Sequence, residues 1–574
     1  MGARRRGLGL AALGALLLLV VGAGVAAVRR GSDERAIATR FMRAWAARDW
    51  EAMHRELTPA DRRRVPLAAF RRAYERAAAT ASARDLAPGP AQELGDGAVR
   101  VPVTVQTNLF GTVREPVTLE VRGGEEEGIA WNRSLVFPGL RRGEKLSART
   151  RLPERADLLA RDGSVLARGA ARVPDPTLSD VALNTVGQLG VPGPERQEQL
   201  RARGVPKDAR VGLSGLERAL DDRLRGQPGG QLRTGRRVLA ASAPRQTDPV
   251  RTTIAPSVVR AAVAGLAGRL GGVTVMDPRT GEVLGFAGIA FSGLQPPGST
   301  MKIITLAAGL EAGITSRRKR YPVETATSLE GVRLENANGE ACGGTLANSF
   351  AESCNSVFAP MGAELGARRF VAAAERFGFN GPPAIPGAAP STLPAAAEIG
   401  DDLAVGSTAI GQGRAQATSL QMAVVAATIA RGGRLPRPTL DLAQARSGGG
   451  GSPDGPRATS PAIARTVSDL MTGVVREGTG TAAAIPGVRV AGKTGTAELE
   501  TTQRCEPVDG NPEACRPGTV NDPTDTSAWF AAFAPALPRT PRAAVGVLVV
   551  RAGAGGETAA PVAKQVLQAA LARG

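Results

Sequence analysis

Histidine is nearly absent from this chain, whose 574 residues include only one, and its scarcity excludes two kinds of chemistry. His54 lies in a stretch with a helical pattern near the N-terminus, where we expect a solvated surface position. A Ser-His-Asp mechanism needs an imidazole beside the nucleophile, and a His-rich metal site needs several rings. We therefore predict no metal site and no cofactor. Any nucleophile must take its base from another residue type.

Aromatic residues are also scarce, at 3% of the chain, although the net charge is +19. A basic protein can attract nucleic acid or an anionic surface. The aromatic residues do not interleave with basic stripes, as a platform for stacked bases requires. We therefore expect no nucleic acid partner, and we interpret the arginine-rich charge as a solvated surface.

The four cysteines fall into two local pairs. Cys342 and Cys354 bracket a short segment, and Cys505 and Cys515 bracket a loop rich in Pro, Gly and Asn. Outside the membrane this spacing favours two disulfides, although four cysteines allow three pairings and Cys354 is equally suited to be a small buried residue. Zinc is a poor alternative, because the chain has no Cys-x-x-Cys.

An uncharged run of 21 residues, Leu8–Val28, follows three arginines at the N-terminus. It is long enough to cross a bilayer, which takes about 20 residues. We predict an uncleaved anchor in residues 1–30, with the bulk of the chain outside. The small residues at 23–27 keep a cleaved signal peptide open as the alternative.

The remaining pattern predicts a multidomain α+β protein. Asp33–Arg48 and Pro66–Ala79 are typical of amphipathic helices, and Val99–Val105 and Val117–Val121 alternate like half-buried strands. Helices followed by an antiparallel sheet indicate a small α+β domain. We expect this small α+β domain to span residues 31–145. A looser, extended linking domain is expected at 146–252, and a domain of Gly-rich strands and Ala-rich helices at 253–574.

Ser299 and Lys302 form the first candidate site. Three residues is close to one helical turn, so both side chains are expected on one face, and a desolvated amine beside a hydroxyl makes a base and a nucleophile. The same spacing recurs at Ser316 and Lys319, in a basic run with no apolar stretch to bury the amine. Pro297 and Gly298 precede Ser299 and an apolar helix follows it, so we expect Ser299 near a helix N-terminus.

Two more short motifs complete a constellation. Ser353-Cys354-Asn355 follows Ser299 by 54 residues, and Lys493-Thr494-Gly495-Thr496 follows Ser353 by 140. Lys302, desolvated and near the second cation Lys493, would have a lowered pKa and accept the Ser299 proton.

Each remaining motif residue suits one step of an acyl transfer. Ser353 can relay the proton to the leaving amine, and Asn355 can bind a substrate amide. Lys493 and Thr494 suit a substrate carboxylate, while Gly495 lets the substrate backbone approach the strand edge. The backbone N–H groups of Ser299 and Thr496 can form an oxyanion hole.

The three motifs resemble the SxxK, SxN and KTG set of the penicillin-binding proteins and serine β-lactamases. Residues 275–284 (VMDPRTGEVL), 409–413 (AIGQG) and 528–530 (AWF) are similar to further segments of that family. Residues 215–217 and 221–226 resemble the dimerisation or pedestal domain of class B transpeptidases. Residues 33–145 resemble the NTF2-like domain of a subgroup. For 253–574 the resemblance implies a β-lactamase-like antiparallel sheet with helices.

The resemblance also implies an activity and partners. Ser299 would be acylated by a peptidoglycan stem peptide ending in D-Ala-D-Ala, and the amine of a neighbouring peptide would then attack, which is D,D-transpeptidation. β-Lactams would acylate Ser299 as substrate mimics. The family works beside membrane glycan polymerases, which implies such a partner for a single-pass protein of the cell membrane with an extracytoplasmic catalytic domain.

Three other functions remain open at this point. A serine β-lactamase uses the same motifs but needs a fast deacylation base, for which Glu398, Asp401 and Asp402 are candidates. A non-enzymatic β-lactam sensor usually has several membrane spans, and this chain has one candidate span. A catalytically idle scaffold is disfavoured, because every motif residue is present.

Overall fold

The computed structural model describes residues 33–447, 455–498, 505–508, 511–517 and 526–573, which fall into two compact units. Unit 1 comprises the described residues up to Arg155, with Val191–Ala209 and Arg225–Thr247. Unit 2 comprises Ala156–Gly190, Arg210–Leu224 and the described residues from Asp248 onward.

The segment predicted as one linking domain, 146–252, is divided between the two units. Its three-stranded sheet belongs to unit 1, and its short helices α5 (Ser179–Thr185), α7 (Gly215–Ala219) and α8 (Asp221–Leu224) belong to unit 2. In unit 2, Arg172 Nε donates to Glu217 Oε1 at 2.7 Å, and both side chains are buried. The looser pattern of Gly, Pro and charged residues in this segment does not mark the division.

The predicted membrane anchor, residues 1–30, lies outside the described residues. Among the helices that the structure does describe, none is both long enough and apolar enough to cross a bilayer.

Unit 1 is built on an antiparallel sheet whose main path runs β1-β3-β4-β5, with β2 paired to β3. Buried valines alternate with exposed residues along β3, as the sequence pattern predicts. A second sheet has the order β12-β11-β6. The strands are β1 (Ala83–Pro88), β2 (Gln92–Gly95), β3 (Ala98–Thr107), β4 (Thr112–Arg122), β5 (Gly128–Ile129), β6 (Leu146–Arg151), β11 (Gly229–Thr234) and β12 (Arg237–Ser242).

Helices cover the first sheet of unit 1, and aromatic rings fill the space between them. Residues 33–47 are helical, followed by α2 (Trp50–Arg55), α3 (Pro59–Arg64) and α4 (Leu67–Ala81), and α6 (Pro194–Ala202) also belongs to this unit. His54 is not the solvated residue that we expected. It is half-buried edge-on against Phe70, with Nε2 2.8 Å from the Val65 carbonyl oxygen.

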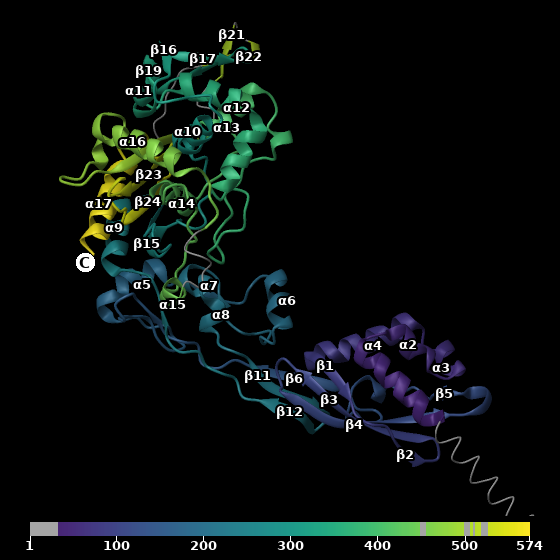
Figure 1. Ribbon diagram of the computed structural model, residues 1–574. Coiled ribbons are helices and arrows are strands. Elements are labelled where there is room, and N and C mark those ends of the chain that lie inside the picture. Colours follow the sequence, from purple (N-terminus) through teal and green to yellow (C-terminus); the bar gives the residue numbers. More distant parts are fainter. Residues whose placement is uncertain (1–32, 448–454, 499–504, 509–510, 518–525, 574) are drawn as a thin grey trace, which may run out of the picture. The chain divides into compact units, whose positions relative to one another are not determined.

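Unit 2 contains a five-stranded antiparallel sheet of the order β15-β14-β24-β23-β20 (Figure 1). The strands are β14 (Gly271–Met276), β15 (Val283–Gly288), β20 (Ala491–Glu498), β23 (Thr526–Ala534) and β24 (Ala543–Val549). Sequence neighbours β14 and β15 pair as a hairpin, whereas β24 inserts between β14 and β23. The strand that carries the Lys-Thr-Gly motif, β20, is therefore at one end of the sheet.

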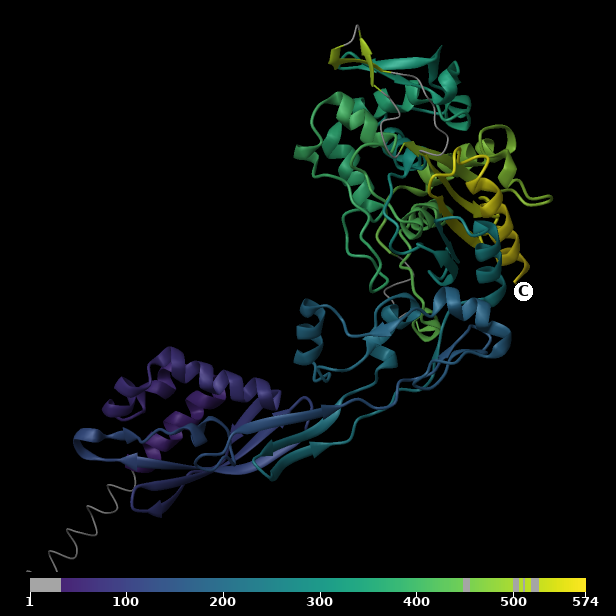
Figure 2. The same cartoon turned by 180° about the vertical axis from the view of Figure 1, so that it is seen from behind.

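Helices pack on both faces of this sheet (Figure 1; Figure 2 shows the same elements from behind). Val545, Val547 and Val549 lie in one apolar cluster with α9 (Pro256–Leu266) and α17 (Ala559–Ala572). The alternate residue Leu548 lies in the cluster on the other side, with α14 (Ser419–Ala430). Because both faces are covered, these strands are apolar almost throughout and do not alternate.

The rest of unit 2 consists of shorter strands and of helices that carry the motifs. The strands are β7 (Leu158–Leu159), β8 (Val165–Ala167), β9 (Leu189–Gly190), β10 (Val211–Gly212), β13 (Val250–Arg251), β16 (Arg320–Glu324), β17 (Ala326–Leu329), β18 (Val332–Glu335), β19 (Cys342–Thr345), β21 (Cys505–Val508) and β22 (Asn511–Pro517). The helices are α10 (Lys302–Glu311), α11 (Leu346–Ala351), α12 (Asn355–Arg376), α13 (Asp402–Ala409), α15 (Leu442–Arg446) and α16 (Pro461–Glu477).

Candidate active site

Ser299 and Lys302 lie at the junction of a 3₁₀ turn and helix α10. The turn spans Gly298–Met301, and Lys302 is the first residue of α10, so Ser299 is near a helix N-terminus as predicted. Ser299 is half-buried, whereas Lys302 is fully buried. The apolar residues that follow Lys302 pack on the core, and this packing withdraws its amine from water.

The amine of Lys302 faces the second motif. Its Nζ donates to the backbone oxygen of Ser353 at 2.7 Å, to Ser353 Oγ at 3.3 Å and to Asn355 Oδ1 at 2.7 Å. Among the hydrogen bonds between described residues, none joins Lys302 Nζ to Ser299 Oγ. Burial, and then the charge of Lys493, hold the pKa of Lys302 well below its usual value.

Lys493 is the second fully buried amine of the site. Its Nζ donates to the Thr494 backbone oxygen at 3.1 Å and lies 5.6 Å from the centre of the Phe350 ring. Burial lowers the pKa of Lys493 to about 7, against a smaller opposing effect of the charge of Glu352. Phe358 lies in the same way over Lys302, at 5.7 Å. Each of the two buried amines thus lies against an aromatic ring.

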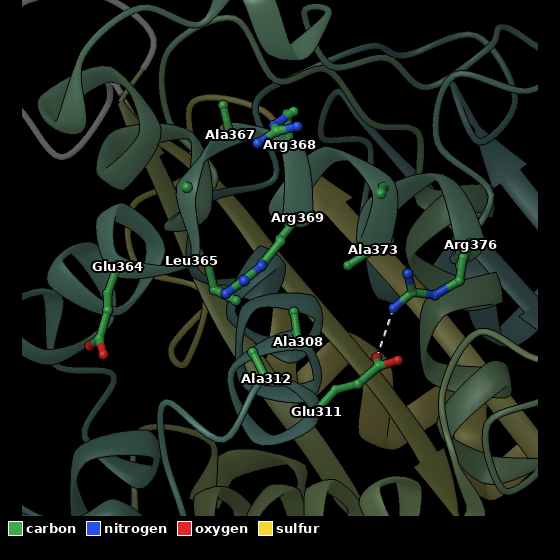
Figure 3. Close-up of a pocket in the computed structure, with 12 residues that line it drawn as sticks. Ala308, Glu311, Ala312, Glu364, Leu365, Ala367, Arg368, Arg369, Ala373 and Arg376 are labelled. Atoms are coloured by element: carbon green, nitrogen blue, oxygen red, sulfur yellow. Dashed lines mark hydrogen bonds and ion pairs between the residues drawn. The ribbon is translucent and has the colours of Figure 1, made fainter.

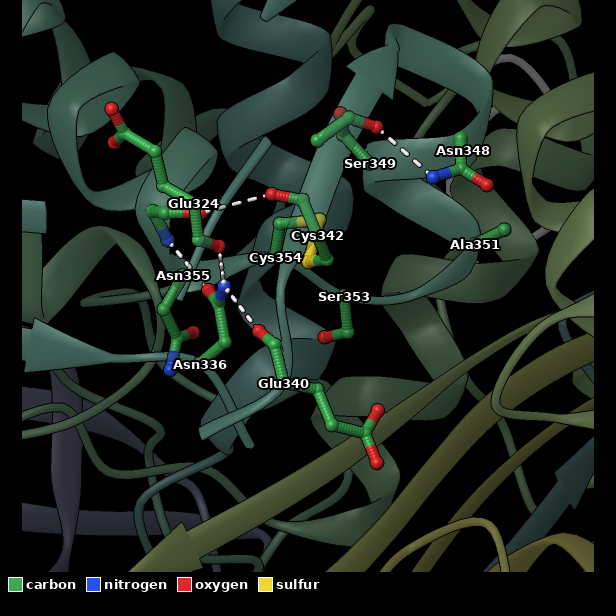
Figure 4. Close-up of a disulfide and its surroundings, with 12 residues drawn as sticks. Glu324, Asn336, Glu340, Cys342, Asn348, Ser349, Ala351, Ser353, Cys354 and Asn355 are labelled. Carbon is green, nitrogen blue, oxygen red and sulfur yellow. Dashed lines mark hydrogen bonds between the residues drawn. A yellow bond between two sulfur atoms is a disulfide. The ribbon is translucent and has the colours of Figure 1, made fainter. Parts of the chain in front are cut away.

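The Ser353–Asn355 motif is held in an unusual turn. Ser353 has a left-handed backbone (φ 61°), and Asn355 is the first residue of α12. The residue between them, Cys354, forms a disulfide with Cys342 of β19 (Figure 4). The other predicted pair, Cys505 and Cys515, lies outside the residues whose side chains are described.

The third motif lies on β20, the strand at the end of the sheet. Thr494 Oγ1 is 2.7 Å from Thr479 Oγ1, and the Thr479 hydroxyl also donates to the Ala351 carbonyl oxygen at 3.2 Å. Thr479 therefore connects the strand of the third motif to the helix that precedes the second. We had assigned no role to Thr479, because it belongs to none of the three motifs.

Glycines allow the first and third motifs to approach each other. Gly298 has φ +53°, and a Cβ there would lie 2.5 Å from the Thr496 backbone oxygen. A Cβ on Gly495 would lie 2.8 Å from the Pro297 backbone oxygen, and one on Gly411 would lie 2.0 Å from the Gly298 oxygen. The backbones of Ser299 and Thr496 are thereby brought side by side. Gly495, which we had assigned to substrate approach, is already needed for this packing.

The second Ser-x-x-Lys copy serves as an internal comparison. Ser316 and Lys319 are both exposed, and Lys319 Nζ donates to the Ile314 carbonyl oxygen. The prediction that this amine stays solvated is confirmed. Equal spacing thus gives two different environments, which differ in burial and in the partners of the lysine amine.

The comparisons with known proteins agree with this geometry. Residues 271–568, more than half of the chain, match the penicillin binding protein transpeptidase domain. The chain belongs to the penicillin-binding protein transpeptidase family. Its relatives in this family include the peptidoglycan D,D-transpeptidase PbpA of Mycobacterium tuberculosis, which is 37% identical over 306 residues, 49% of this chain and 56% of that protein. PbpA of Mycolicibacterium smegmatis is 38% identical over 309 residues, 50% of this chain and 57% of that protein. The chain spans little more than half the length of these relatives.

Solved structures give the same family assignment. Penicillin-binding protein A from M. tuberculosis, as a ceftriaxone acyl-enzyme complex, aligns with a TM-score of 0.54 and 28% identity, over 73% of this chain and 98% of that one. A D,D-transpeptidase domain from Eggerthella lenta aligns with a TM-score of 0.54 and 28% identity, over the same shares of the two chains. The predicted α+β transpeptidase fold is therefore confirmed for the catalytic part of this penicillin-binding protein family member.

A cavity of about 950 Å³ opens elsewhere in unit 2, between the later parts of α10 and α12 (Figure 3). Its lining includes Leu365, Arg369 and Arg376, and Arg376 donates to Glu311 at 2.7 Å. None of the motif residues lines this cavity. Its lining mixes paired charges with alanines and offers no nucleophile, so it is not the candidate active site.

Proposed function

We propose that this protein is a serine-type peptidoglycan D,D-transpeptidase that β-lactams inactivate by acylating Ser299. The observation that carries the proposal is the buried Lys302 amine, hydrogen-bonded to both polar residues of the second motif and near a second buried cation. A lysine in this setting loses its proton at a pH where an exposed lysine keeps it. The neutral amine can then serve as the base for a serine.

The acylation step follows from these positions. Lys302 takes the proton of Ser299, whose oxygen attacks the carbonyl carbon of the penultimate D-Ala of a stem peptide. The N–H groups of Ser299 and Thr496 stabilise the oxyanion, and Ser353 passes the proton to the departing D-Ala nitrogen. The amine of a second stem peptide attacks the resulting ester, which forms the cross-link and restores Ser299.

Substrate contacts follow from the third motif and from Asn355. Lys493 and Thr494 bind the terminal carboxylate of the donor peptide, and Asn355 hydrogen-bonds an amide of its backbone. The open edge of β20 gives an extended peptide a strand to pair with. Gly495 adds no side chain to that edge.

The upstream part completes the proposal. We assign an NTF2-like domain to 31–145 and a membrane anchor to 1–30. We assign a pedestal to 146–252, although this segment is divided between the two units. In this assignment the protein is a single-pass protein of the cell membrane, its catalytic domain is extracytoplasmic, and a membrane glycan polymerase is its partner. The helices packed on an antiparallel sheet in unit 1 support the first of these assignments.

Nothing in the described residues supports a deacylation role for the carboxylates suggested for a β-lactamase. Glu398, Asp401 and Asp402 are exposed, and Asp401 caps α13 by accepting the Ala404 N–H at 2.9 Å. None of the hydrogen bonds between described residues joins them to Ser299 or Lys302. We therefore expect slow deacylation.

Fluorescent penicillin tests the proposal on the purified full-length protein. We expect one covalent label, which Ser299→Ala abolishes and which the matched variant Ser316→Ala retains in full. A label that persists in Ser299→Ala overturns the assignment of the nucleophile. Release of the label within seconds would identify a β-lactamase, whereas release over hours, with cross-linking of peptidoglycan peptides, supports a transpeptidase and rules out a non-catalytic sensor.

A further inference from the structure

Helix α12 begins with a residue that cannot cap it. The N-cap residue is Cys354, and no side-chain oxygen of its own satisfies the first N–H groups of the helix. Helix N-termini leave such N–H groups without partners, and Ser, Thr, Asp or Asn normally accept from them. The sulfur of Cys354 is already committed to the disulfide with Cys342. The first residue of this helix is Asn355, so the missing cap lies directly at the second motif.

A residue distant in the sequence supplies the cap. Asn336 Oδ1 accepts the N–H of Ser356 at 2.9 Å. The same amide donates through Nδ2 to the backbone oxygens of Glu324, at 2.7 Å, and Glu340, at 3.0 Å. Asn336 is only 5% exposed. Figure 4 shows it between these two backbone segments and the start of α12.

The residue before Asn336 reaches the motif itself. Asn355 Nδ2 donates to the backbone oxygen of Glu335 at 2.8 Å, while Asn355 Oδ1 accepts from Lys302 Nζ at 2.7 Å. The Glu335 carbonyl therefore fixes which end of the Asn355 amide faces the lysine. With the amide reversed, Oδ1 would face the Glu335 carbonyl oxygen, and that hydrogen bond would be lost.

We propose that Asn336 is a positioning residue for the acyl transfer: it caps α12 in place of Cys354 and, through the adjacent Glu335 carbonyl, holds the Asn355 amide with its oxygen toward Lys302. This inference rests on the proposed function, because it is measured through acylation of Ser299. Asn336 lies outside all three motifs, and no hydrogen bond between described residues joins it to Lys302. Its effect on the reaction passes through the start of α12 and the Asn355 amide.

The test compares acylation rates in the full-length protein. Asn336→Ala removes the cap and both donors, and we expect the second-order rate constant for fluorescent penicillin to fall about tenfold, because the Asn355 amide loses its orientation. Asn348→Ala is the matched control, since Asn348 also donates to a nearby backbone oxygen, that of Gly343, but not to the motif. The control should stay within about twofold of the unmodified protein.

A double-mutant comparison separates positioning from general stability. In an Asn355→Ala background, Asn336→Ala should slow acylation by less than about twofold. A full additional tenfold loss in that background, or an unchanged rate for Asn336→Ala alone, overturns the inference. If Asn336→Ala does not fold, Asn336→Asp replaces it, because its oxygen still caps the helix while both donors are lost. A rate for Asn336→Asp equal to that of the unmodified protein likewise overturns the role of the Glu335 segment.

The same experiment distinguishes the two possible failures. If the unmodified protein takes no label, the proposed function falls and this inference falls with it. If the label forms and depends on Ser299, but the rate does not depend on Asn336, only this inference is wrong.

Discussion

Lys302 Nζ lies 2.7 Å from Asn355 Oδ1, a contact across 53 residues of sequence that joins the base of the first motif to the amide of the second. The amine therefore rests on the second motif rather than on Ser299 in the free protein. These hydrogen bonds keep the buried lysine amine oriented.

The pH dependence of acylation should be bell-shaped. Acylation needs a neutral Lys302, whose fraction rises with pH, and a protonated Lys493, whose pKa is about 7. The rate should therefore fall as pH rises above about 7, as Lys493 loses its charge. Second-order acylation rate constants measured from pH 5 to pH 10 test this prediction. The control variant Lys319→Met should have the same pH profile as the unmodified protein. A rate that climbs steadily to pH 9 contradicts the role given to Lys493.

Removing the charge of Lys493 should stabilise the fold while it abolishes acylation. A buried ammonium costs stability, and replacing buried charged groups by apolar side chains of similar volume is often neutral or stabilising, by up to about 4 kcal/mol. Lys493→Met should therefore unfold at a higher temperature and take no label. Because the folded pKa of Lys493 is lower than its unfolded value, the cost is full below about pH 7 and is relieved as pH rises toward the unfolded value. The gain in Tm should accordingly shrink between pH 6 and pH 10, and a gain that grows with pH would refute this account.

Two glycines in one short segment give a matched pair. Gly411 and Gly413 both have positive φ, +83° and +69°, so alanine is strained at either position, by about 1–2 kcal/mol. A Cβ on Gly411 would lie 2.0 Å from the Gly298 backbone oxygen, whereas a Cβ on Gly413 meets nothing within 4 Å. Gly411→Ala should therefore displace the Ser299 turn and slow labelling at least tenfold more than Gly413→Ala. Equal rates in the two variants would show that the turn tolerates the displacement.

Much of the fold follows from local pattern. Alternating valines predict β3 and β4, and the charge-free run before Leu310 predicts α10, because burial periodicity is a local property of the chain. The three motifs also predict which side chains meet in the site. The prediction that these side chains meet depends on the resemblance to a family. No local sequence pattern indicates that Lys302 lies near Lys493.

Other features had no signal in the sequence. The division of residues 146–252 between two units depends on strand pairing between distant segments. The cap that Asn336 provides depends on where a loop returns in space. Gly495 was explained by substrate approach because the Pro297 backbone, which it must accommodate, is 198 positions earlier in the chain.

The disulfide between Cys342 and Cys354 should matter for both stability and rate. It closes a loop of 12 residues, and loops of about that size contribute roughly 3 kcal/mol when cross-linked. Cys354 lies between Ser353 and Asn355, so breaking its disulfide should let both partners of the Lys302 amine move. Replacing both cysteines with alanine should therefore lower Tm and slow labelling. A reductant should lower the acylation rate of the unmodified protein to a similar degree, and reoxidation should restore that rate. If the double variant and the reduced protein both acylate at the original rate, then the hydrogen bonds around Asn355 hold the motif without the cross-link.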